Sequence, residues 1–396
     1  MNSPVHRLLN VVSAASRRIG LRELVRVSPV SDAIWKGARR ALLSVTKEQM
    51  AAPAAPSAPA VAAVTAVTEP QALDAPHLVA LDQLDAIEAT TFRAAMRKRY
   101  ESMELDPALK ELYASFALST VERGKKITSF IASKTPIAGK RYLDVGCAYG
   151  GFLVTFQAAG AREVVGIDYD KDLLTFAHCL VRDYALPARV EQASILDTTL
   201  PARLGKFDII TCNDVIEHVG DPKLALKNLS ALLAPGGLLC MEIPNRFAAT
   251  FVRRDGHFYK FGITSLPKHL ADKRFTLENG GGFHDVTYKS LDYYVHTLER
   301  AGLEVSVMNP PPRDPAATLA ACSAVFDEVD WRAGLPGVDA HTARYARRLS
   351  ASFRRLHGKW RADEKRLEGE RLQFAHRMAL TFKEEFWVLV ARPARA

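Results

Sequence analysis

Cysteine is scarce in this sequence, with five residues among 396 and no C-x-x-C pair. An odd number without such pairs argues against a disulfide framework and against a cysteine-based zinc site. Long apolar runs are missing too: the longest uncharged stretch, residues 49–68, is mostly alanine and contains three prolines, so it cannot span a membrane. Since the pattern shows no secretory signal either, we expect a cytoplasmic protein in a reducing compartment.

A surplus of basic residues is confined to the two ends of the chain. The formal net charge is +9, to which residues 1–49 contribute +6 and residues 341–396 contribute +8, while residues 50–340 carry −5. This split disfavours a nucleic-acid-binding core, so we expect no nucleic-acid partner. The N-terminal arm suits peripheral contact with an anionic membrane, a mitochondrial transit peptide or plain solvation, and we favour the arm of a bacterial enzyme.

Composition and apolar spacing divide the chain into segments. Prolines at every third position indicate an extended linker, and helical spacing continues up to the first strand. A connection of about 75 residues before the last strand is too long for a loop, and its apolar stripe predicts a helical hairpin with interruptions at Gly358 and Gly369. We expect a basic arm (1–49), an Ala/Pro-rich linker (50–70), a helical cap (71–137), a core (138–308), a helical insertion (309–385) and a last strand with tail (386–396).

Short apolar runs alternate with helical segments from residue 141 onward. Such alternation predicts an α/β fold with a doubly wound, mostly parallel sheet and right-handed crossovers. We expect seven strands, over residues 141–145, 164–167, 189–193, 207–212, 238–243, 303–308 and 386–391. The helical cap precedes this sheet, and the helical insertion interrupts it before the last strand.

A glycine-rich turn follows the first expected strand, in Y-L-D-V-G-C-A-Y-G-G-F from residue 142 to 152. The strand ends in Asp144, Gly146 permits a tight turn, and Gly150 and the glycine after it let backbone approach a ligand where a helix begins. A NAD site would require G-x-G-x-x-G, and Ala148 stands at the middle glycine. The loop therefore indicates a nucleotide-like cofactor without deciding which one.

Further motifs follow in order along the chain. Asp168 ends the second strand, where it can accept both hydroxyls of a ribose, as NAD and S-adenosylmethionine equally require. The segments S-I-L-D (194–197), F-D-I-I-T-C-N-D-V-I-E-H-V-G-D-P (207–222) and L-L-A-P-G-G-L-L (232–239) come later. Together these motifs resemble the class I S-adenosylmethionine-dependent methyltransferases, especially the small-molecule branch that includes the ubiquinone-biosynthesis O-methyltransferases. The resemblance covers about residues 138–308 and the final strand.

The resemblance implies S-adenosylmethionine as cofactor and assigns its binding residues. Asp144 would hold the amino group of the methionine part, above a loop shaped by Gly146, Cys147, Ala148 and Gly150. Asp168 would bind the ribose hydroxyls, and Tyr169 would pack along the adenine. The adenine amino group would donate to Asp197, which Ile195 and Leu196 flank, while Asn213 and Asp214 would lie beside the sulfonium. For each carboxylate, a helix cap or a solvated turn is the structural alternative.

His218 is the expected general base, because it follows the fourth strand and an imidazole can take a hydroxyl proton near neutral pH. His257, His269 and His284 are alternatives. No H-x-x-x-H or H-E-x-x-H spacing occurs, so we expect no metal ion. The predicted reaction is methyl transfer to an oxygen of a small-molecule, glycan or lipid-linked acceptor; a NAD-dependent oxidoreductase and a non-catalytic methyltransferase-like scaffold are the rival hypotheses.

Overall fold

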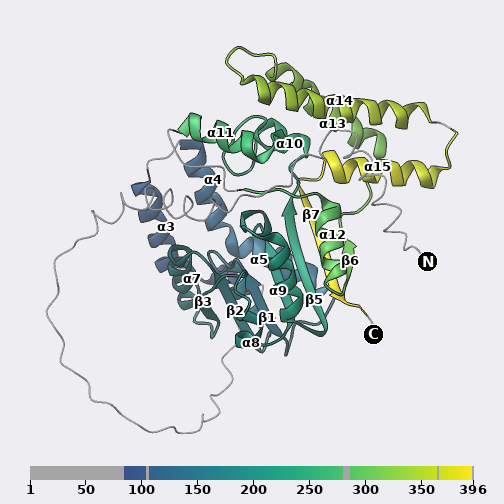
Figure 1. Ribbon diagram of the computed structural model, residues 1–396. Helices are drawn as coiled ribbons and strands as arrows, with labels where there is room; N and C mark the ends of the chain where they lie inside the picture. Colours follow the sequence, from purple (N-terminus) through teal and green to yellow (C-terminus); the bar gives the residue numbers. More distant parts are fainter. Residues whose placement is uncertain (1–83, 104–106, 280–285, 364, 395–396) are drawn as a thin grey trace, which may run out of the picture.

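The computed structural model describes residues 84–103, 107–279, 286–363 and 365–394. Within them seven strands form one sheet in the order β3-β2-β1-β4-β5-β7-β6 (Figure 1). The strands are β1 (Arg141–Val145), β2 (Glu163–Asp168), β3 (Arg189–Gln192), β4 (Phe207–Asn213), β5 (Leu233–Pro244), β6 (Leu303–Val307) and β7 (Phe386–Pro393). The arm and linker predicted for residues 1–70 lie outside the described residues, and the predicted domain boundaries stay predictions.

The direction of the strands confirms the predicted fold class. Strands β1 to β5 pair in parallel, and β7 runs antiparallel to both β5 and β6. Six of the seven strands match the predicted positions closely, whereas β5 begins five residues earlier than predicted, at Leu233. The early start follows from an irregular register, in which Phe207 pairs with Leu233 and Ile209 already pairs with Leu238.

Helices cover both faces of the sheet. On one face α5 (Thr120–Ala132), α6 (Gly151–Ala158) and α7 (Lys171–Asp183) bury side chains such as Ile131, Phe156 and Leu174. On the other face lie α8 (Leu200–Leu204), α9 (Pro222–Leu232) and α12 (Leu291–Arg300), with Leu229 and Val295 in the core. The N-terminal helices α3 (Thr90–Ser102) and α4 (Pro107–Leu118), and the short 3-10 helix η2 (Leu84–Ala86), pack outside this layer, on α6 and α7.

Many of these helices begin where the sequence places a capping residue. The side chains of Asp170, Asp221, Ser290, Asp314 and Asp339 each accept a hydrogen bond from a backbone N–H in the first turn that follows. Such caps satisfy donors that a helix start leaves unpaired. Within the described part of the chain, no helix combines the length and the apolarity needed to cross a membrane.

The insertion before β7 contains three helices, one more than the hairpin that the apolar spacing of residues 345–382 predicts; the last two form that hairpin. The three helices are α13 (Pro315–Arg332), α14 (Ala340–Ala362) and α15 (Glu368–Phe382). Gly358 interrupts nothing, because it lies inside α14 on an exposed face, and Gly369 lies in the first turn of α15. The three helices share an apolar core with α10 (Ala249–Arg253), and Figure 1 shows them beyond the carboxyl ends of the strands, near α11 (Lys268–Asn279).

Asn245 joins the end of β5 to the end of α15. Its Nδ2 donates to the backbone oxygens of Leu380, Thr381 and Glu384 at 3.1, 3.1 and 2.8 Å, and its own N–H donates to Glu385 O at 2.7 Å. The residue is fully buried. One side chain therefore satisfies carbonyls that the helix end would otherwise leave unpaired.

Replacing Asn245 by Ala should destabilise the protein by about 2 kcal/mol, because buried carbonyls lose their donor and gain no substitute. Urea unfolding followed by circular dichroism measures this. Asp314→Ala, which removes an exposed cap of α13, is the matched control and should cost about 1 kcal/mol. Equal stability of N245A and the unaltered protein would contradict this account of the junction.

Candidate active site

The carboxyl ends of the central strands carry the residues that the sequence singles out. Asp144 lies near the end of β1, Asp168 at the end of β2, and Asn213 at the end of β4. Since β1 pairs with both β2 and β4 in parallel, these ends share one edge of the sheet. In open α/β sheets, ligands bind outside this edge at the point where the strand order reverses, which here is between β1 and β4.

Asp144 is buried within a short hydrogen-bonded chain. Thr211 Oγ1 donates to Asp144 Oδ1 at 2.6 Å, and the Tyr142 hydroxyl lies 2.6 Å from Thr211 Oγ1. Burial raises the pKa of Asp144 to about 7; the hydrogen bond from Thr211 opposes this shift, and the charge of Asp168 adds to it. An ammonium group bound here would favour the ionised form.

The glycine loop turns back sharply toward β2. The N–H groups of Gly146 and Cys147 donate to Ile167 O at 2.8 and 3.0 Å, and Gly150 N donates to Cys147 O at 2.8 Å. Gly146 has φ +75°, and a Cβ there would collide with the Val215 side chain. The loop thus requires glycine at this position for backbone shape and for close approach to the segment after β4.

Ala148 also adopts a left-handed conformation, with φ +43°. A non-glycine residue pays roughly 1–2 kcal/mol for this region, which explains why glycine suits the position. The Ala148 N–H donates to Asp168 Oδ2 at 2.9 Å, so the strained turn is held to the end of β2. At Gly151 an added Cβ would collide with the backbone of Thr120, so the glycine predicted to face a ligand instead allows α5 and α6 to approach closely.

Asp168 accepts two backbone hydrogen bonds, from Ala148 N at 2.9 Å and from Asp170 N at 2.8 Å. The carboxylate is therefore fixed in the loop between β2 and α7. Tyr169 beside it is 49% exposed, as a side chain that covers a bound adenine would be before the ligand arrives. Their predicted contacts with ribose and adenine stay predictions.

The S-I-L-D segment adopts a capped turn. Asp197 Oδ1 accepts from the N–H and the hydroxyl of Thr199, both at 2.8 Å, and these bonds lower the pKa of Asp197. Ile195 is buried in the core and Leu196 packs against that core. Asp197 thus has the turn-capping role that was its structural alternative, and its contact with adenine stays a prediction.

Two polar residues at the end of β4 face the same edge. Asn213 Oδ1 accepts from Glu242 N at 3.1 Å, and Asn213 Nδ2 is buried with no hydrogen-bond partner among the described residues. Asp214 has φ +54°. Burial, and then the charges of Glu217 and Glu242, raise the pKa of Asp214 to about 7. An amide donor and a titrating carboxylate are thus available to a ligand.

Arg123 on α5 is a site residue that the sequence analysis missed. Burial lowers its pKa, and the carboxylates of Asp214, Glu242 and Asp144 counteract this effect. The guanidinium stacks on Phe116 at 3.5 Å from the ring centre. Its Nε has no hydrogen-bond partner among the described residues. A lone arginine on an N-terminal helix carries no motif, so only the packing of α5 on α6 reveals it.

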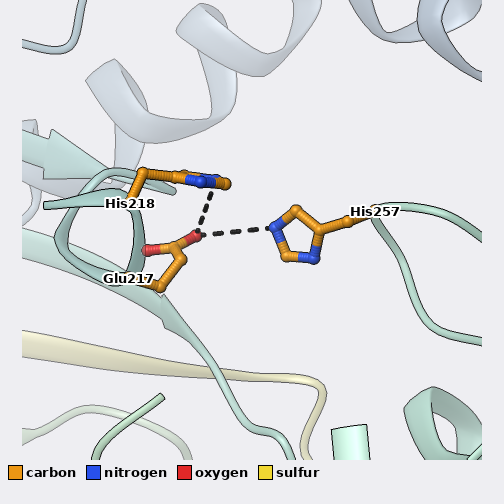
Figure 2. A group of neighbouring side chains, drawn as sticks. All are labelled: Glu217, His218 and His257. Carbon is orange, nitrogen blue, oxygen red and sulfur yellow. Dashed lines mark ion pairs between the residues drawn. The ribbon is translucent and has the colours of Figure 1, made fainter. Parts of the chain in front are cut away.

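Beyond Asp214 the chain forms a cluster of Glu217, His218 and His257 (Figure 2). Glu217 and His218 belong to the 3-10 helix η3 (Ile216–His218), and His257 comes from the loop after α10. Glu217 Oε1 lies 3.7 Å from His218 Nε2 and 3.9 Å from His257 Nε2. The predicted base therefore lies beside one of its three alternatives; His269 is exposed on α11, and His284 lies outside the described residues.

Carboxylates set the charge of His257. Burial alone lowers its pKa, but Asp255 and Glu217 raise it to about 10. Asp255 is itself fixed, since it accepts from the N–H groups of His257 (2.8 Å), Phe258 and Lys260. The Tyr288 hydroxyl lies 3.2 Å from His257 Nδ1. These partners hold Nδ1, and Nε2 is directed toward Glu217.

A cavity of about 490 Å³ opens near the same edge. Glu242 on β5, Thr250 on α10, Cys322 on α13, and Phe386 and Val388 on β7 are among the residues that line it. The Thr250 hydroxyl is buried with no partner among the described residues. The cavity therefore combines apolar side chains with polar ones, among them Lys383 and Glu384, and Glu242 connects it to the carboxylates around Arg123.

A family model described as "Methyltransferase domain" matches residues 119–306. The chain contains a methyltransferase domain. This match covers α5 and all strands but β7, which joins the same sheet. It confirms the resemblance to S-adenosylmethionine-dependent methyltransferases that the motifs predict.

Curated relatives resemble the methyltransferase domain over part of their length. The ubiquinone biosynthesis O-methyltransferase of Methylococcus capsulatus is 35% identical over 119 residues, which are 30% of this chain and 48% of that protein. The protein of the same name from Coxiella burnetii is 35% identical over 144 residues, or 36% and 59% of the two chains. The chain thus spans about half the length of the relatives it matches.

Solved structures similar to this chain include magnesium protoporphyrin IX methyltransferase from Synechocystis, with bound S-adenosylhomocysteine. It has 12% identity and a TM-score of 0.38, over 55% of this chain and 87% of that one. An S-adenosylmethionine-dependent methyltransferase from Mesorhizobium loti has 18% identity and a TM-score of 0.36, over 67% and 95%. The fold of the methyltransferase domain is established by its own strand order.

Proposed function

We propose that this protein transfers a methyl group from S-adenosylmethionine to an oxygen of a small-molecule acceptor. The observation that carries the proposal is the pair of strand-end carboxylates, Asp144 and Asp168, on either side of the Gly146–Gly150 loop in a methyltransferase domain. Asp144 suits the cofactor's ammonium group, and Asp168 suits its ribose hydroxyls. Arg123, whose charge interacts with Asp144, suits the carboxylate of the methionine part.

The chemistry requires little more than positioning, because the sulfonium is already activated. The acceptor hydroxyl loses its proton, its oxygen forms a bond to the methyl carbon, and the carbon–sulfur bond breaks with its electron pair going to sulfur. The products are the methyl ether and the neutral thioether S-adenosylhomocysteine. The protein supplies proximity, orientation and a group that removes the proton. We assign this last role to His218, which is one-third exposed beside Glu217.

The cavity next to Glu242 is the proposed acceptor site. Its volume of about 490 Å³ falls within the range of about 300–1,000 Å³ that small-molecule sites usually have. Side chains such as Phe386 and Val388 would contact the acceptor's apolar part, and the unpartnered Thr250 hydroxyl would bind a polar group. A glycan or lipid-linked acceptor would have to present one such unit to the same cavity.

Calorimetry should detect S-adenosylmethionine and S-adenosylhomocysteine binding but no NAD binding. Because ionised Asp144 favours the cofactor's ammonium group and its pKa lies at about 7, affinity should rise between pH 6 and 7.5, by at most about tenfold per pH unit for each linked proton. Asp144→Asn should remove one linked proton from this slope. Asp214, with a pKa also at about 7, retains its own contribution.

Binding of NAD instead would support the oxidoreductase alternative and overturn the proposal. Cofactor binding without methylation of any fraction of a host extract, supplied with isotope-labelled S-adenosylmethionine, would support the scaffold alternative. Methylation in such a fraction, followed by mass spectrometry of the product, identifies the acceptor and the methylated atom.

A further inference from the structure

Glu217 presents a problem that methyl transfer alone does not explain. Its side chain is fully buried, and neither carboxylate oxygen has a hydrogen-bond partner among the described residues. A buried carboxylate is expensive unless it is paired and hydrogen-bonded. The two nearest imidazole nitrogens, at 3.7 and 3.9 Å, lie within ion-pair distance, and Glu217 helps to raise the pKa of His257, but they are too far for hydrogen bonds.

The spacing around Glu217 suits a shared ion. One carboxylate oxygen of Glu217 and one ring nitrogen each of His218 and His257 all lie within 4.8 Å of one another. Bonds of about 2.0–2.1 Å from a tetrahedral Zn²⁺ to nitrogen and oxygen place neighbouring ligand atoms about 3.4 Å apart. The two distances from Glu217, 3.7 and 3.9 Å, need to shorten by a few tenths of an ångström. The two ring nitrogens lie within 4.8 Å of each other and need to approach by up to about 1.4 Å.

His257 is oriented as a metal ligand would be. Metal-binding histidines commonly engage their second ring nitrogen with a carboxylate or another polar group, which fixes the ring. Here His257 Nδ1 lies 3.2 Å from the Tyr288 hydroxyl and 3.7 Å from Asp255 Oδ1, and Nε2 is left for Glu217 and its ion. His218 is 35% exposed, so a fourth position can open to solvent or substrate, as in catalytic zinc sites.

We propose that Glu217, His218 and His257 bind a divalent transition-metal ion, Zn²⁺ first among them. Two imidazoles and one carboxylate form a ligand set suited to such ions and poorly suited to Mg²⁺ or Ca²⁺. The spacing of histidines in the sequence predicts no metal ion because the ligands come from two segments, 39 residues apart.

This inference rests on the proposed function only for the role of the ion in methyl transfer. An acceptor hydroxyl at the open position would have its pKa lowered by the cation, and its proton would pass to solvent before the oxygen attacks the methyl carbon. His218 would then act as a ligand and not as a free base. Binding of the ion itself does not depend on S-adenosylmethionine.

The test uses the full-length protein, stripped with a chelator and titrated with ZnCl₂ or CoCl₂. Elemental analysis after dialysis should give one ion per chain, and Co²⁺ should produce visible absorption bands. Glu217→Gln and His257→Gln should each weaken the affinity for the ion at least about a hundredfold, since loss of a partner behind a ligand already costs about 10–100-fold. Tyr288→Phe, which removes such a partner, should weaken it about tenfold.

His178→Gln is the matched control, because His178 is an exposed histidine on α7. The metal-free E217Q protein should keep its circular dichroism spectrum and melting temperature, while Zn²⁺ should raise the melting temperature of the unaltered and H178Q proteins and not that of E217Q. Absence of binding, or binding that H178Q abolishes and E217Q leaves intact, would overturn the metal site. S-adenosylhomocysteine binding is measured on the same samples: cofactor binding without Zn²⁺ binding rejects the ion and keeps the proposed function, and the reverse rejects the function and keeps the ion.

Discussion

His218→Ala should reduce turnover at least about a hundredfold on the methylated acceptor and change the affinity for S-adenosylmethionine no more than a few-fold. Removal of a hydroxyl proton at the transition state is typically worth about a hundredfold to ten-thousandfold in rate, whereas the predicted cofactor contacts lie with Asp144 and Asp168. Rates measured with isotope-labelled cofactor, together with calorimetry on the same samples, separate the two effects.

The pH profile tells the two roles of His218 apart. If its imidazole is a free base, the acidic limb of the profile disappears in the variant; if it is a metal ligand, the variant also loses its Zn²⁺. Near-normal turnover in a well-folded H218A protein would reject His218. Equal losses of cofactor affinity and turnover would indicate that it only shapes the loop after β4. His178→Ala serves as the control here too.

Asp168→Ala should weaken cofactor binding by about 1.5–3 kcal/mol, the contribution of hydrogen bonds to a charged group. The expected cause is loss of the ribose contacts, with a further contribution from the two N–H groups, of Ala148 and Asp170, that the carboxylate now holds. Isothermal titration with S-adenosylhomocysteine measures the change.

Asp170→Ala is the matched control for Asp168, because it removes a neighbouring carboxylate that caps α7. It should lower stability by about 1 kcal/mol and leave cofactor affinity unchanged. An unaltered affinity in the D168A protein would reject the ribose assignment. A comparable loss of affinity in both variants would show that loop order, and not contact with ribose, determines binding.

The sheet could be predicted well because each strand is a short apolar run between turn residues. The first helix of the insertion, α13, could not, because its apolar residues, among them Leu319, Cys322 and Phe326, are interspersed with alanines that weaken the helical pattern. Gly358 illustrates a second limit: an exposed helical glycine is tolerated where the neighbouring turns supply enough packing, here through Phe353 on the same helix.

The candidate site likewise contains residues that could be predicted from the sequence and residues that could not. Asp144 and Asp168 could be found from the sequence because each lies at the end of a buried strand, and strand ends lie at one edge of a parallel sheet. Arg123 and Tyr288 come from a helix and a loop that only the tertiary packing brings to that edge, and the same packing singles out His257 from the alternative bases. Glu217 was visible next to His218, but its burial without hydrogen bonds is a property of the folded chain alone.

The hydrogen bonds from Asn245 to the end of α15 bear on how an acceptor is selected. The helical insertion is attached to the sheet twice at this end: by the hydrogen bonds from Asn245, and by the chain itself, because α15 continues into β7 within a few residues. Rotation of the insertion about this junction would break several buried hydrogen bonds at once. We therefore expect the residues that line the cavity to have the same positions before and after an acceptor binds. Discrimination among acceptors would then depend on the fit to a rigid shape, and enlarging an accepted molecule by one ring should exclude it.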